Sequence, residues 1–170
     1  MNGAITRYSG AMIALHWATV AMVVTAYFLS EGERFVRIHP PLLHFAFGLG
    51  VLLLVVPRLI ARALGGAPAM QDHGLLTLAA KAGHGVLYGL LVAVPLTGWY
   101  AASRLGVRIS LLGFSVPPLA QAVSGGAGWI GKVHQVGGNL ILILAGLHAV
   151  MALWHQFVMR DETLRRMSPW

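Results

Sequence analysis

Apolar residues dominate four long stretches of the chain, and acids and bases are almost confined to the segments between them. A helix needs about 20 predominantly apolar residues to cross a bilayer. The pattern therefore predicts four membrane-spanning helices, over residues 11–30, 41–62, 78–102 and 131–158. The last stretch is longer than a bilayer requires, so its final turns are expected to project into water. We predict an all-α integral membrane four-helix bundle that forms a single domain over residues 1–170.

The widest connection between the predicted helices, residues 103–131, is rich in glycine and proline. It contains one short apolar stretch, from Leu111 to Phe114. A loop of this length inside a compact protein usually has structure or function of its own. We therefore expect it to form an ordered cap that lies on the membrane surface.

The composition of the chain narrows the classes of function open to it. Of the residues, 57% are hydrophobic and only 10% are charged, against about 25% charged in soluble domains, which excludes an ordinary water-soluble enzyme. There is no cysteine, which excludes disulfide scaffolds, thiolate metal sites, iron–sulfur clusters and covalently attached haem. The net charge is +7. For so apolar a chain, the expected anionic partner is a lipid membrane and not nucleic acid.

The distribution of basic residues predicts the orientation of the chain. With four spans, both termini lie on the same side of the membrane. Seven lysines and arginines fall on that side and five on the other. Because basic residues are retained on the cytoplasmic side, this difference favours cytoplasmic termini.

Histidine is the remaining candidate metal ligand. Ionisable groups inside a bilayer are costly and signal function. Five histidines lie inside the membrane part of the predicted spans: His16, His44, His84, His134 and His148. His155 lies near the cytoplasmic end of the last span. His134 and His148 share one helix, 14 residues apart. They therefore point within about 40° of each other, at depths about 21 Å apart.

Depth in the membrane pairs four of these histidines. His44 and His134 enter their helices from the outer side at similar depth, whereas His16 and His148 lie toward the inner side. Two bis-imidazole pairs, one in each leaflet, are the arrangement that holds two b-type haems. The alternatives are packing histidines, proton carriers or a haem-free metal transporter, although no carboxylate or cysteine in the spans accompanies them.

Several glycines lie near these histidines along the sequence: Gly48, Gly50, Gly137, Gly138 and Gly146. Residues without side chains can leave room for a porphyrin face against a helix. Glycines are also common in membrane helices because they allow helices to pack closely. The sequence leaves both interpretations open.

Eight short motifs carry a family resemblance through their order and spacing: A-L-H-W (14–17), H-F-A-F-G (44–48), R-L-I-A-R (58–62), H-G-V-L-Y (84–88), P-L-T-G-W (95–99), G-K-V-H-Q (131–135), G-L-H-A-V (146–150) and D-E-T-L-R-R-M-S-P (161–169). No single motif suffices, but together they cover nearly the whole chain. The sequence resembles the prokaryotic cytochrome b561 family, whose four-helix membrane cytochromes carry two b haems.

The resemblance implies a ligand set and a direction of electron transfer. It assigns His44 with His134 to an outer haem and His16 with His148 to an inner haem, with His84 as the runner-up for His16. The family is also similar to the membrane cytochrome subunits of formate dehydrogenases and nickel–iron hydrogenases. By that likeness, we expect a multi-pass protein of the bacterial inner membrane that passes electrons from the periplasmic face to quinone.

Two further histidines are candidates for the quinone end. His84 lies near the cytoplasmic start of the third span, and His155 follows His148 by seven residues on nearly the same face of its helix. Quinone reduction needs a hydrogen-bond donor and protons, and imidazole supplies both near neutral pH. The alternative is that His84 only packs and that His155 contacts lipid headgroups.

At the opposite end, the cations Arg104, Arg108 and Lys132 flank the long loop with no acid between them. Such a patch attracts a small anion, and some members of the resembled family use superoxide as the electron donor. The resemblance therefore favours a superoxide:quinone oxidoreductase. The alternative is an electron-transfer or anchor subunit that receives electrons from a periplasmic partner, such as a dehydrogenase or hydrogenase, docked on the same cations.

Overall fold

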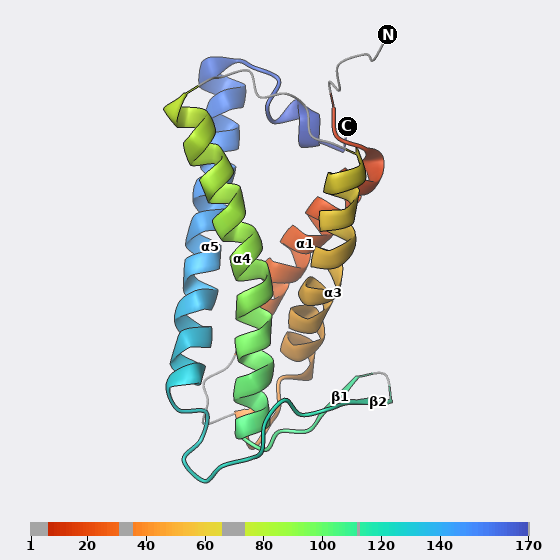
Figure 1. Cartoon of the computed structure of the whole chain (residues 1–170), viewed down its shortest axis with the longest axis vertical. Helices are drawn as coiled ribbons and strands as arrows, with labels where there is room; N and C mark the ends of the chain where they lie inside the picture. The colour runs from red at the N-terminus through yellow and green to blue at the C-terminus, as the bar shows by residue number, and fades with distance from the viewer. Residues whose placement is uncertain (1–6, 31–35, 66–73, 112, 170) are drawn as a thin grey trace.

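The computed structural model describes residues 7–30, 36–65, 74–111 and 113–169. Four long helices dominate it: α1 (Gly10–Phe28), α3 (Leu42–Gly65), α4 (Leu75–Arg104) and α5 (Trp129–Trp154) (Figure 1). All four are long and apolar enough to cross a membrane. The predicted all-α membrane bundle is confirmed, and the helices begin and end within a few residues of the predicted positions.

The helices pack as two pairs. Helix α1 lies against α3, α4 lies against α5, and α3 joins the pairs by contacting α4. The centre of this packing is a small cluster of buried apolar side chains: Val51, Val55, Leu91 and Ile141. Much of the outer surface is also apolar. Leu53 is 74% exposed and Ile143 is 60% exposed, as expected where lipid and not water is the solvent.

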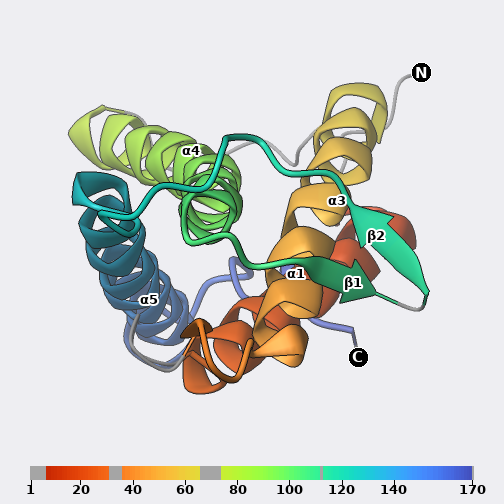
Figure 2. The same ribbon diagram turned by 90° about the horizontal axis from the view of Figure 1, so that it is seen from below.

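The long loop after α4 forms an ordered hairpin that the sequence analysis did not predict. Strands β1 (Ile109–Leu111) and β2 (Phe114–Val116) pair antiparallel, with Ile109 buried against the bundle. The loop is tied to α4 at three points: the Trp99 indole donates to the carbonyl of Pro117 (3.0 Å), the Leu119 amide donates to the Ser103 hydroxyl (3.0 Å), and the Val123 amide donates to the carbonyl of Arg104 (3.0 Å). Strand β1 contacts α3, and Figure 2 shows the hairpin on the near side of the bundle in that view; we call this side the hairpin end.

The C-terminal tail covers the start of α1 at the opposite side of the bundle, which we call the termini end (Figure 1). Helix α5 continues as a π-helical turn, His155–Met159, and a 3-10 turn follows at Arg165–Met167. The tail carbonyls then accept hydrogen bonds from the Tyr8 amide (3.2 Å) and the Trp17 indole (3.0 Å). Tail and first helix therefore form one structural unit, although they are about 150 residues apart in the sequence.

Candidate functional site

Two histidines from different helices meet near the hairpin end. His44 lies in the first turn of α3 and His134 lies in the second turn of α5. Their ring centres are 5.9 Å apart and their planes are nearly perpendicular, at 86°. The sequence paired these residues by depth, and the structure places their rings next to each other.

Backbone carbonyls determine which nitrogen carries the proton in both rings of this hairpin-end pair. The Nδ1 of His44 lies 2.8 Å from the carbonyl of Ala26, and the Nδ1 of His134 lies 2.9 Å from the carbonyl of Val94. Because a carbonyl oxygen can only accept, each ring donates through Nδ1. The Nε2 lone pairs of both rings are thereby left free for a metal, the usual arrangement of a ligating histidine.

A glycine on α4 makes room for one of these rings. A Cβ added at Gly98 would lie 2.6 Å from Cε1 of His134 and 2.8 Å from its Nδ1. No side chain tolerates such contacts, so the ring position depends on glycine at 98. The sequence analysis missed Gly98, because its proximity to His134 arises only when α4 packs on α5.

The five glycines singled out from the sequence divide into two groups. A Cβ at Gly50 would press on Met22 and one at Gly137 on Val94, each at 3.0 Å, so these two allow close helix packing. Gly48, Gly138 and Gly146 face open space, with nothing within 4 Å of an added Cβ. Only the second group is available to leave room for a cofactor.

Three histidines, and not two, gather toward the termini end. The ring centre of His148 lies 6.4 Å from that of His16 and 5.1 Å from that of His84. His84 donates through Nδ1 to the carbonyl of Ala80, at 2.6 Å, which leaves its Nε2 free. The structure thus brings together the predicted pair and its runner-up, and His148 is common to both possibilities.

An arginine joins this termini-end cluster. The Nη2 of Arg58 lies 2.8 Å from Nδ1 of His16, and its guanidinium carbon lies 5.1 Å from the ring centre of Tyr88. Since guanidinium only donates, the His16 Nδ1 is the acceptor. The sequence analysis used Arg58 as a topology cation and as part of the R-L-I-A-R motif, but not as a partner of His16. This contact follows from the packing of α1 on α3.

His155 lies beyond this cluster, at the end of α5, and pairs with an acid. Its Nδ1 is 2.6 Å from a carboxylate oxygen of Asp161, whose other oxygen accepts from the Thr163 amide at 2.9 Å. Burial raises the pKa of Asp161, but the hydrogen bonds from His155 and Thr163 outweigh it and hold that pKa below its ordinary value. Asp161 therefore stays ionised and orients the imidazole.

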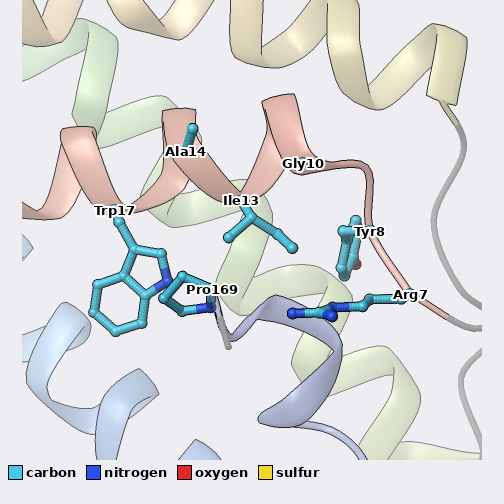
Figure 3. A pocket seen from close by; sticks show the side chains of 7 residues that line it. All are labelled: Arg7, Tyr8, Gly10, Ile13, Ala14, Trp17 and Pro169. Carbon is cyan, nitrogen blue, oxygen red and sulfur yellow. The ribbon is translucent and has the colours of Figure 1, made fainter.

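A pocket of about 430 Å³ opens where the tail crosses the start of α1 (Figure 3). Arg7 and Tyr8 supply polar groups, while Ile13, Trp17 and Pro169 supply apolar surface. The Trp17 ring contacts the His16 ring, with centres 5.5 Å apart, so the pocket adjoins the termini-end cluster. Neither His84 nor His155 lines it. The sequence could not reveal this pocket, because it is closed by Pro169 of the folded-back tail, which is distant in sequence from the rest of the lining.

The three predicted steering cations all lie at the hairpin end. Arg104 ends α4, Arg108 precedes β1, and Lys132 is in the first turn of α5. Arg108 and Lys132 are exposed, whereas Arg104 is partly buried and its Nε has no hydrogen-bond partner. These positive charges therefore share the end of the bundle that holds His44 and His134.

The spacing of the paired rings fits axial ligation of haem iron. Two imidazoles bound at about 2.0 Å on opposite sides of one iron have ring centres about 6.3 Å apart. The observed spacings are 5.9 Å for His44 with His134 and 6.4 Å for His16 with His148. Among the described residues, no three His, Asp or Glu side chains are grouped to hold a bare metal ion.

Comparison with known proteins points to the same class. The family described as prokaryotic cytochrome b561 matches residues 7–170. The chain is 29% identical over 169 residues to a protein named probable superoxide oxidase CybB from Yersinia pestis, with 96% of each chain covered. It is 32% identical over 172 residues to cytochrome b562 of Cereibacter sphaeroides, with 94% of each covered.

A third relative, cytochrome b561 homolog 2 of Escherichia coli, is 29% identical over 170 residues, with 95% of this chain and 90% of the relative covered. These matches extend over almost the full length of both partners. The chain belongs to the prokaryotic cytochrome b561 family and is a multi-pass membrane protein of electron transfer that binds haem b.

Proposed function

We propose that the protein carries two b haems and passes electrons from superoxide, at the hairpin end, to quinone, at the termini end. His44 and His134 hold one haem, and His16 and His148 hold the other. Haem b, when bound, supplies reversible one-electron transfer. One observation carries the proposal. The bundle contains two histidine pairs at different levels, and the rings of each pair have the spacing expected for two ligands of one haem iron. The hairpin end then faces the periplasm, and the termini face the cytoplasm of a bacterial inner membrane.

His16 is the better partner for His148 than His84 is. The 6.4 Å spacing of the first pair matches a ligand–iron–ligand arrangement, whereas 5.1 Å between His84 and His148 is short for it. His84 then remains as an imidazole beside the haem site, hydrogen-bonded to Ala80 through Nδ1. In that position its unprotonated Nε2 can accept a hydrogen bond or a proton.

Quinone binds in the pocket between α1 and the tail. A quinone headgroup has polar carbonyls on an apolar ring, which suits a pocket with Arg7 and Tyr8 at one side and Ile13, Trp17 and Pro169 at the other. Trp17 lies between the pocket and His16: its ring lines the pocket and also contacts the His16 ring. His155, kept in orientation by Asp161, holds a proton at the same end of the bundle for quinone reduction.

Filling the pocket tests the quinone assignment. In Ala14→Phe, a bulky ring enters the space lined by Ala14, so we expect the KM for quinone to rise at least about tenfold with haem content unchanged. Ala21→Phe is the matched control, because Ala21 is exposed on α1 and does not line the pocket. An unchanged KM in Ala14→Phe would place quinone elsewhere.

The cations at the hairpin end are proposed to steer superoxide. Arg104, Arg108 and Lys132 attract an anion toward the end of the bundle that holds His44 and His134, and such steering raises association rates by about 10- to 1000-fold. When superoxide is mixed with the protein and quinone, we expect fast haem reduction that slows with added salt. The double variant Arg104→Gln/Arg108→Gln should slow it at least about tenfold, whereas Arg62→Gln, at the termini end, should not.

The same experiment separates the enzyme from its alternative. Slow haem reduction that does not respond to salt or to the double substitution would contradict superoxide as the donor. The protein would then fit an electron-transfer or anchor subunit, in which the exposed Arg108 and Lys132 dock an acidic partner protein.

A further inference from the structure

The two histidine sites differ sharply in the groups that surround them. At the hairpin end, His44 and His134 both donate to backbone carbonyls, at 2.8 and 2.9 Å. At the termini end, His16 instead contacts the guanidinium of Arg58, at 2.8 Å. The sequence has no acid between Glu33 and Asp72 or between Asp72 and Asp161. Helices α3, α4 and α5 therefore contain no carboxylate to neutralise Arg58.

Each environment favours a different oxidation state of a bound haem. A carbonyl that accepts the Nδ1 proton makes imidazole a more basic ligand, which stabilises the oxidised iron. A fixed positive charge in a region of low dielectric constant stabilises the reduced iron, which carries one positive charge less. Arginine keeps its charge at all relevant pH values, so this effect is permanent.

We propose that Arg58 gives the termini-end haem the higher reduction potential, so that electron transfer from the hairpin end to the termini end is downhill. This inference rests on the proposed two-haem function and adds the residue that sets its direction. Arg58 is not proposed as a ligand. Its guanidinium lies beside His16 and acts on a bound haem through its positive charge. Among the described residues, the hydrogen bonds and ring contacts of the hairpin-end rings are with the carbonyls of Ala26 and Val94, with the Phe45 ring and with each other, and not with a cation.

The charge stays beside the haem site whichever ring nitrogen of His16 is protonated. When His16 accepts from Arg58 at Nδ1, its own proton is on Nε2. A neutral His16 that binds iron through Nε2 carries the proton on Nδ1 and no longer accepts from Arg58. The guanidinium is also held over the Tyr88 ring, at 5.1 Å, and that contact does not depend on the His16 proton.

The test is a redox titration of the purified, haem-loaded protein, followed by its visible α-band. Removing the charge in Arg58→Gln should shift the equilibrium of the termini-end haem toward the oxidised form by about tenfold. This corresponds to a reduction potential lower by about 59 mV for one electron. Arg58→Lys keeps a positive charge and should stay close to the wild-type potential. Arg62→Gln removes an equal charge about one turn further along α3 and should have a clearly smaller effect.

Two outcomes would overturn the inference. One is an unchanged pair of potentials in Arg58→Gln with both haems bound. The other is independent of how that variant folds: in His134→Ala, which leaves the termini-end haem alone, the remaining haem must titrate near the higher of the two wild-type potentials. If it titrates near the lower one, the proposed order is wrong. Failure of the two-haem function itself would look different, because the wild-type protein would then bind fewer than two haems.

Discussion

Replacing His134 with alanine is expected to remove the hairpin-end haem and to leave the termini-end haem in place. Replacing His148 should do the reverse. Each change deletes one of two axial nitrogens, and neither histidine contacts the other pair: His134 faces His44, and His148 faces His16 and His84. Haem per polypeptide, measured as pyridine haemochrome in detergent-purified protein, should fall from about two to about one in each variant.

His39→Ala provides the matched control, because His39 is exposed in the connection before α3 and its loss should leave haem content unchanged. The comparison of His16→Ala with His84→Ala then decides the termini-end ligand. We expect only His16→Ala to lose a haem. If His84→Ala loses one and His16→Ala keeps both, His84 is the ligand and the spacing of the rings has misled the assignment.

A single added methyl group at Gly98 is expected to disable the hairpin-end haem almost as completely. In Gly98→Ala the new Cβ would lie 2.6 Å from Cε1 of His134, so the ring has to move and its hydrogen bond to Val94 is strained or lost. Disturbing the groups that orient a metal ligand typically costs about 10- to 100-fold in affinity. Haem titration of the apo-protein should show that loss for one of the two haems.

Gly89→Ala is the control for this substitution. It adds the same methyl group to the same helix, and nothing lies within 4 Å of the added Cβ. It should bind both haems normally and can be slightly more stable, because alanine is the better helix former by about 1 kcal/mol. Equal haem affinity in Gly98→Ala and Gly89→Ala would contradict the role given to the contact with His134.

The bilayer explains why the sequence predicts the bundle so well. Each span must be about 20 residues of apolar side chains with all backbone groups bonded internally, so length and hydropathy nearly determine the helices. Depth along a helix follows from residue counting, and the pairing of His44 with His134 followed from depth alone. His84 shows the limit of counting, because it shares the depth of His16 and only the ring spacings separate the two.

What the sequence did not predict depends on contacts between distant segments. The closeness of Gly98 to His134 needs α4 packed on α5, and the contact of Arg58 with His16 needs α1 packed on α3. The pocket beside Trp17 needs the tail to return over the first helix. The hairpin strands are only three residues each, too short for an alternating pattern to stand out in the sequence.

The central claim is that four of the histidines hold two haems, and a visible spectrum tests it most directly. We would record the dithionite-reduced minus oxidised spectrum of the detergent-purified protein and measure haem per polypeptide. Two bis-histidine sites predict a b-type α-band, split or broadened by the two environments, and about two haems per chain. A protein purified from haem-replete cells with one haem or none would contradict the account, and the paired histidines would then need another function.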